Sequence, residues 1–95
     1  MERTPCRTPA EGRDGVTNIP TWKFEAIQRG IMNVLERGDC PWGQLTELVK
    51  AELTEKELAD MGKLGWHVIS VKLELEVRGD IYRLKQKGPQ VISKT

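Results

Sequence analysis

Residues 71–84, VKLELEVRGDIYRL, decide the fold of this chain. Apolar and charged residues alternate strictly from Val71 to Val77, which on a strand would place the apolar side chains on one face and both glutamates on the other. Arg78, Gly79 and Asp80 then precede a second run of strand-forming residues. The period of two by itself predicts a β-hairpin.

The same residues also carry a helical pattern. One side of such a helix would hold four apolar residues, Leu64, Val68, Val71 and Leu75. Their spacings of four, three and four match the helical period. Gly79 suits the left-handed C′ position that ends a helix, and Arg78 would face the negative end of the helix dipole. Local pattern leaves strand and helix as open alternatives.

A resemblance to a known fold favours the helix. Residues 75–84, LEVRGDIYRL, resemble the segment "leucine, glutamate, two variable, glycine, variable, isoleucine, variable, arginine" of winged-helix domains. The resemblance implies that the third helix of a helix-turn-helix ends at Gly79. It also implies that Leu75 packs into the core and that Ile81 opens the first strand of the wing. We therefore expect a helix from Trp66 to Arg78.

A looser resemblance covers the chain from about Pro20 to Thr95. This span is similar to a small bacterial family of winged-helix type with no assigned function, on the basis of Trp66-His67 and residues 88–90, Gly-Pro-Gln. The fold class expected is α+β, a winged helix-turn-helix with three main helices and a short C-terminal two-stranded hairpin as the wing. Residues 18–95 would form this domain.

The first 17 residues are predicted to be a flexible tail, because they contain the tripeptide Arg-Thr-Pro twice and Val16 as their one branched aliphatic residue. A first helix is predicted to begin near Pro20, capped by Thr17 or Asn18, and to end before Gly38. Its core side would comprise Phe24, Ile27, Ile31, Val34 and Leu35. Gly30 costs about 1 kcal/mol relative to alanine unless another helix packs close to it.

Residues 39–43 are predicted to be a loop, and a short second helix follows with Leu45, Leu48, Val49 and Leu53 on its inner side. Thr54 and Glu57 have the spacing of a capping box, which predicts a separate helical turn over residues 55–61. Residues 81–85 and 91–93 are predicted to pair as the wing hairpin.

Composition limits the classes of function. A chain of 95 residues with 5% aromatic and 31% charged residues forms one domain with a small aliphatic core. We expect no cofactor, no metal site and no enzymatic activity, because His67, Cys6 and Cys40 lack the spacing of ligands or of a nucleophile and its base. The sequence has no apolar stretch of roughly 20 residues, so we expect a cytoplasmic protein without a membrane partner.

Binding of double-stranded DNA, as in a transcription regulator, is the leading functional prediction, since winged-helix domains place the third helix in the major groove and the wing on the backbone or in the minor groove. Residues 78–95 carry five basic residues against one acid, although net charge is only +1. The residues assigned to DNA by position and type are Lys63, His67, Ser70, Lys72, Lys85 and Lys87.

The third helix itself favours an alternative. If Val68, Val71 and Leu75 face the core, the opposite and lateral faces are apolar, and Glu74 adds a charge that repels DNA. These outer residues are Trp66, Ile69, Leu73 and Val77. Such a stripe is typical of a protein interface, so a homodimer or another protein could bind through Trp66, Leu73 and Val77. Packing of the N-terminal segment or Trp22 over it would explain the stripe equally well. An accessory subunit of an enzyme is the third hypothesis.

Overall fold

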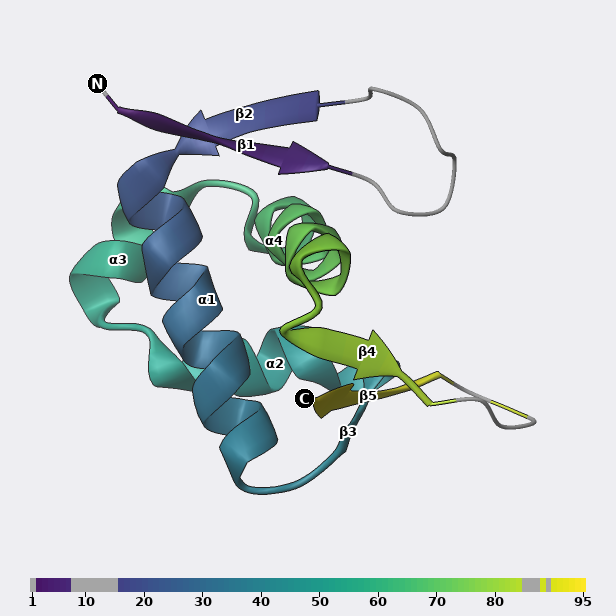
Figure 1. Ribbon diagram of the computed structural model, residues 1–95. Coiled ribbons are helices and arrows are strands. Elements are labelled where there is room, and N and C mark those ends of the chain that lie inside the picture. Colours follow the sequence, from purple (N-terminus) through teal and green to yellow (C-terminus); the bar gives the residue numbers. More distant parts are fainter. Residues whose placement is uncertain (1, 8–15, 85–87, 89) are drawn as a thin grey trace.

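The computed structural model describes residues 2–7, 16–84, 88 and 90–95. This part of the chain is α+β, with four helices and two small antiparallel sheets (Figure 1). The helices are α1 (Thr21–Glu36), α2 (Trp42–Glu52), α3 (Glu55–Met61) and α4 (Leu64–Arg78). One sheet pairs β1 (Arg3–Arg7) with β2 (Val16–Pro20). The other has the order β3-β5-β4, formed by β3 (Cys40–Pro41), β5 (Val91–Lys94) and β4 (Ile81–Arg83).

The deciding stretch is helical. Val68, Val71 and Leu75 are fully buried on the inner side of α4, and Leu64 is partly buried, so the helical period is the one that matches the core. Gly79 ends the helix in the left-handed conformation, with φ at +81°, and its N–H donates to the carbonyl of Glu76. The strand alternative for Val71–Val77 is wrong. The alternation arises because charged residues lie on both flanks of the helix.

α1 buries the five predicted residues and packs on α2. A Cβ atom built on Gly30 would lie 3.0 Å from Cγ1 of Val49, so the glycine allows the close approach of α2 that its position suggested. The predicted caps are wrong, because Thr17 and Asn18 pair in β2 and Pro20 occupies the N-cap position without a side-chain hydrogen bond.

The capping box at α3 is confirmed. Thr54 Oγ1 accepts a hydrogen bond from the Glu57 N–H at 3.1 Å, and Glu57 Oε1 accepts one from the Thr54 N–H at 2.9 Å. The backbone hydrogen bond from Thr54 is the main reason why the pKa of Glu57 lies below its usual value. The motif therefore separates α3 from α2 as a helix of its own.

The C-terminal hairpin forms between β4 and β5, with Ile81 opposite Lys94 and Arg83 opposite Ile92. It extends into a third strand, because Cys40 and Pro41 pair with β5. The loop predicted over residues 39–43 is therefore wrong in part, because Cys40 and Pro41 form a strand and α2 already begins at Trp42. A strand of two residues is too short to show a period in the sequence. Lys85, which was predicted to end the first strand of the hairpin, and residues 86, 87 and 89 between the strands lie outside the described residues.

The N-terminal segment departs most from its prediction. Arg3–Arg7 is a strand rather than part of a flexible tail, and it pairs along its whole length with β2. Cys6 and Ile19 are buried in the common core, 4% and 1% exposed. Composition did not predict the ordered structure of this segment, because contacts with a helix that is distant in the sequence hold its strands in place. Residues 8–15 of the predicted tail lie outside the described part of the chain.

α4 occupies the position on which the remaining elements converge. It contacts α1, α2, β1 and β4, and Figure 1 shows it between the β1–β2 hairpin and β4. Within the residues that the structure describes, no helix has the length and apolar character needed to cross a membrane.

Replacing Gly30 by leucine tests the close packing of α1 on α2. We expect Gly30→Leu to lower the free energy of unfolding by about 1–3 kcal/mol, because a larger side chain would overlap Val49. Urea unfolding followed by circular dichroism measures this change. The control is Gly43→Leu in the first turn of α2, where an added Cβ meets no atom within 4 Å. Equal losses in both variants would contradict the assigned contact.

Candidate interaction surface on the fourth helix

The outer face of α4 carries no charged side chain. It consists of the residues opposite the buried stripe, namely Trp66, Ile69, Ser70, Leu73 and Val77. Trp66 is 48% exposed and Ile69 is 45% exposed, whereas the other three are partly buried. The hydroxyl of Ser70 donates to the carbonyl of Trp66 at 3.1 Å, so this polar group is already used within the helix.

One flank of α4 is held by the carboxylate of Glu74. Glu74 Oε1 accepts hydrogen bonds from the backbone N–H of Arg7 at 2.8 Å and from its Nε at 3.0 Å. Glu74 Oε2 accepts from Arg7 Nη2 and from Arg78 Nε, both at 2.8 Å. The Glu74 side chain is only 2% exposed, so this network ties β1 to α4 through a buried charge.

The environment of Glu74 lowers its pKa to about 2 from an ordinary value of 4.5. The side-chain hydrogen bond from Arg7 is the largest cause, and together with the remaining bonds from Arg7 and Arg78 it outweighs the effect of burial. Glu74 therefore stays ionised across the physiological range. Its predicted role as an exposed charge that repels DNA is wrong, because two guanidinium groups cover it.

The pKa of the neighbouring Cys6 thiol reflects the tight packing of β1. Burial raises the pKa of the Cys6 thiol to about 11, and the charge of Glu74 raises it further than Arg78 lowers it. Cys6 is therefore a protonated, buried side chain at neutral pH and not a nucleophile.

The opposite flank of α4 is built around Glu76. Lys72 Nζ lies 3.1 Å from Glu76 Oε1, and Arg83 Nε of β4 lies 3.4 Å from the same oxygen. Lys72 is 4% exposed and its ammonium lies 4.7 Å from the centre of the Trp42 ring. Both oxygens of Glu76 are buried, and no hydrogen-bond partner for them occurs among the described residues. Ion pairing with two cations thus compensates the charge of this carboxylate.

Among the described residues, the ion pairs of each flank contain more positive than negative charge. Glu74 is accompanied by Arg7 and Arg78, and Glu76 by Lys72 and Arg83. The side chains of Arg7 and Arg83 remain 53% and 46% exposed. The uncharged outer face of α4 is therefore bordered on both sides by partly exposed guanidinium groups.

Of the residues assigned to DNA, the structure describes four, and two of these are buried. Lys63 is exposed and Ser70 is partly buried, but His67 and Lys72 are buried, which corrects the exposed positions assumed for them. His67 Nδ1 lies 2.7 Å from the Lys63 carbonyl oxygen, and its ring packs edge-on against Trp66. The two wing lysines, Lys85 and Lys87, lie outside the described residues.

The alternative interface residues lie together. Trp66, Leu73 and Val77 share the outer face, and Ile69 belongs with them because it follows Trp66 by three residues and precedes Leu73 by four. Of the N-terminal hairpin, β1 contacts α4 on the flank that contains Glu74. The prediction that the N-terminal segment packs over the stripe is not met at Trp66 and Ile69, which stay exposed, and residues 8–15 of that segment lie outside the described residues.

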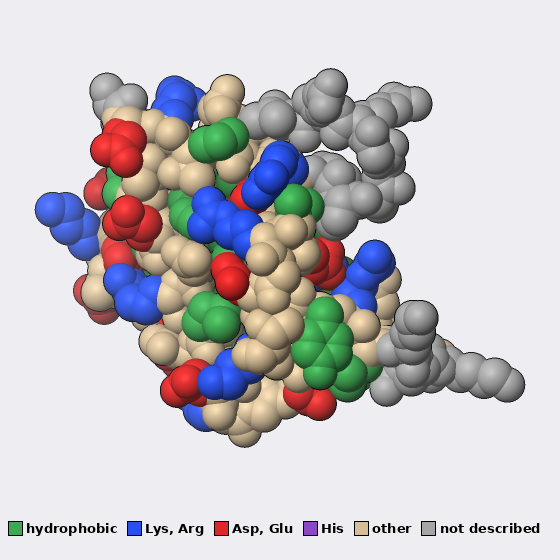
Figure 2. Space-filling model, in the orientation of Figure 1, with side chains coloured by type: hydrophobic (Ala, Val, Ile, Leu, Met, Phe, Trp, Pro, Cys, Tyr) green, Lys and Arg blue, Asp and Glu red, His purple; other side chains and the backbone are tan. Residues whose placement is uncertain are grey.

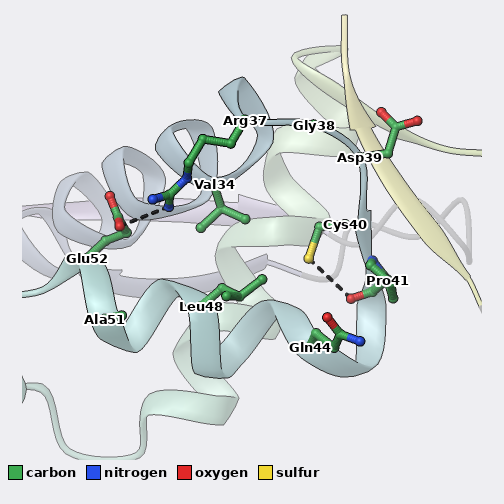
Figure 3. A pocket seen from close by; sticks show the side chains of 10 residues that line it. All are labelled: Val34, Arg37, Gly38, Asp39, Cys40, Pro41, Gln44, Leu48, Ala51 and Glu52. Atoms are coloured by element: carbon green, nitrogen blue, oxygen red, sulfur yellow. Dashed lines mark hydrogen bonds and ion pairs between the residues drawn. The ribbon is translucent and has the colours of Figure 1, made fainter.

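A hollow of about 370 Å³ lies between the end of α1, β3 and α2 (Figure 3). Figure 3 shows Leu48 and Val34 facing it, with the Arg37–Glu52 ion pair of 2.9 Å at one end. The Cys40 thiol donates to the Pro41 carbonyl oxygen at 3.3 Å, and burial raises its pKa. This hollow therefore contains no activated nucleophile.

Charges of both signs are interspersed over α1 and α3, on the face of the molecule shown in Figure 2. Hydrophobic side chains appear there as separate patches rather than as a continuous area (Figure 2). No group of three or more His, Cys, Asp or Glu side chains arranged to hold a metal ion occurs within the described ranges. The outer face of α4 is therefore the strongest candidate for a functional surface.

The profile of the "Family of unknown function (DUF6958)" matches residues 3–92. The chain therefore belongs to this family, and the match includes β1, the segment for which composition predicted no structure. No curated protein sequence and no solved structure matches the chain.

Neutralising Glu74 tests the buried ion-pair network. The folded-state pKa of about 2 lies below the ordinary 4.5, so the charge stabilises the fold above pH 5, and this contribution is lost as the pH falls towards 2. We expect Glu74→Gln to reduce the free energy of unfolding at pH 7 by about 3 kcal/mol. The difference from the parent protein should narrow between pH 5 and pH 2, as measured by urea unfolding.

Glu47→Gln is the matched control, because Glu47 is exposed on α2. This substitution should change stability by less than about 0.5 kcal/mol at any pH. A loss in Glu74→Gln that does not depend on pH would show that the carboxylate charge is not what stabilises this site.

Proposed function

We propose that this member of the DUF6958 family is a protein-interaction module of winged-helix type that binds its partner through the outer face of α4. The observation that carries the proposal is the uncharged stripe of Trp66, Ile69, Leu73 and Val77. Its two most exposed members are a tryptophan and an isoleucine. Large apolar side chains that remain exposed together are typical of surfaces that bind other proteins.

Several features support the winged-helix part of the proposal. Three longer helices are followed by a C-terminal hairpin, and the third of them, α4, ends at a left-handed Gly79. Leu75 is fully buried, and Ile81 is buried at the start of β4, as the winged-helix resemblance implies. Because a fold supports many functions, the interaction role rests on the surface of α4 rather than on this likeness.

The same surface argues against reading of DNA by α4. Base edges are recognised by hydrogen-bond donors and acceptors, and the side chains of the outer face offer few of these: the Ser70 hydroxyl, which already donates to Trp66, and the indole N–H of Trp66. Lys72, the cation expected in the first half of the helix, is buried beside Trp42. Insertion into the major groove would place hydrocarbon against the bases.

DNA binding remains a second candidate because exposed cations surround α4. Lys63 is exposed at its beginning, and the guanidinium groups of Arg7 and Arg83 are partly exposed on its flanks. These side chains could contact phosphate without reading sequence.

Photo-cross-linking tests the interaction role. We expect a benzophenone amino acid at position 69 to form covalent adducts with a protein in extracts of the source cells, because Ile69 is 45% exposed on the proposed surface. The control places the same group at position 48, since Leu48 is 40% exposed on α2. Adducts should disappear when Trp66→Ala is added. Equal adducts at both positions, or none at position 69, would contradict the proposal.

Fluorescence anisotropy tests the DNA candidate. That candidate predicts micromolar or tighter binding to a mixed-sequence duplex at low salt, with an affinity that falls steeply as salt is raised. Changing Lys85 and Lys87 together to glutamate should weaken binding to all sequences and flatten the salt dependence. The matched control changes the exposed Lys50 and Lys56. Absence of binding by the parent protein at low salt removes the DNA candidate.

A further inference from the structure

The proposed surface is a strip along α4 on which a helix of a partner could lie. Trp66, Ile69, Leu73 and Val77 follow one another at spacings of three, four and four residues along α4. A helix of 15 residues is about 22 Å long. β1 contacts α4 along one flank and β4 contacts it along the other, so both sides of the strip are occupied. A helix laid along such a strip can insert apolar residues at the same spacings.

The charge beside the strip indicates the chemistry of the partner. The flank at β1 has two guanidinium groups for one carboxylate, and the flank at β4 has an ammonium and a guanidinium for one carboxylate. Arg7, Arg78 and Arg83 have side chains that are 53%, 36% and 46% exposed. Acidic residues on both sides of a partner's apolar stripe would complement these cations.

The α4 helix of a second copy of this chain does not provide that complement. In a two-fold dimer with antiparallel α4 helices, each β1 flank would face the β1 flank of the other copy. In a parallel dimer, the β1 flank would face the β4 flank. Both arrangements bring flanks with excess positive charge together, and such like-charge contacts disfavour association.

We infer that the outer face of α4 binds an acidic amphipathic helix of another protein. Apolar residues of that helix would pack on Trp66, Ile69 and Leu73, and its carboxylates would pair with Arg7 and Arg83. This inference rests on the proposed function and adds the chemical class of the partner to it. The phosphates of a nucleic acid would pair with the cations but would not cover the apolar strip between them.

The test uses fluorescein-labelled synthetic peptides of 18 residues and the full chain. The acidic peptide has leucine at spacings of three, four and four, with glutamate on both sides of this stripe. One control peptide replaces each glutamate by lysine, and a second replaces each leucine by alanine. Anisotropy titrations at low and moderate salt measure the affinities.

We expect micromolar binding of the acidic peptide that is at least about tenfold tighter than binding of either control peptide. Trp66→Ala should weaken binding by about tenfold or more, while Trp22→Ala, which removes the partly exposed tryptophan of α1, should leave it unchanged. Arg83→Gln should weaken binding severalfold and reduce its salt dependence. The matched control is Arg37→Gln, because Arg37 pairs with Glu52 away from α4.

Other outcomes overturn the inference. Equal affinity for the glutamate and lysine peptides, or no binding of the acidic peptide, excludes an acidic helix as the partner. Displacement of the acidic peptide by a 20-base-pair duplex at lower concentration assigns the surface to nucleic acid. Self-association in sedimentation equilibrium that Trp66→Ala abolishes assigns it to a second copy.

The photo-cross-linking experiment separates failure of the inference from failure of the proposed function. Protein adducts at position 69 together with no preference for the acidic peptide would retain the interaction role and reject this partner class. Absence of both adducts and peptide binding would reject the two together.

Discussion

The buried carboxylate of Glu74 is the interaction on which the arrangement around α4 depends. An ionised group that is removed from water must be paired and hydrogen-bonded, and here Arg7 supplies its backbone N–H and its guanidinium while Arg78 supplies a second guanidinium. Arg7 lies 67 residues away in the sequence, so this site holds two distant parts of the chain, β1 and α4, together. The core position of Cys6 follows from it.

The ion pairing of the charged side chains of α4 explains why its outer face is apolar. Glu74 is turned toward β1, Lys72 toward α2 and Glu76 toward β4. Each of these side chains takes part in an ion pair. The outer side holds Trp66 and Ile69, which are both exposed, and no charge. A helix that appears charged and alternating in sequence thus presents an apolar face outward. The proposed interaction role is a consequence of this distribution.

Elements governed by local rules were predicted well. The core side of α1, the capping box at Thr54 and Glu57 and the left-handed Gly79 each depend on residues within a few positions of one another. The exposure assumed for His67 and Lys72 is wrong, since residue type and helical position could not reveal that these side chains are buried. Burial of these side chains depends on neighbouring elements, among them Trp42 beside Lys72.

The sequence by itself determined the core side of α1, the capping box that begins α3, the glycine that ends α4 and the apolar stripes of α4, because helical period, capping and glycine conformation act over three or four residues. The tertiary structure alone decided which charges are buried, where β1 and β3 pair, and which apolar stripe remains outside. These outcomes depend on partners far apart in the chain, such as Arg7 with Glu74 and Cys40 with Ile92. Long-range pairing is set by the free energy of the whole fold, so no local pattern encodes it.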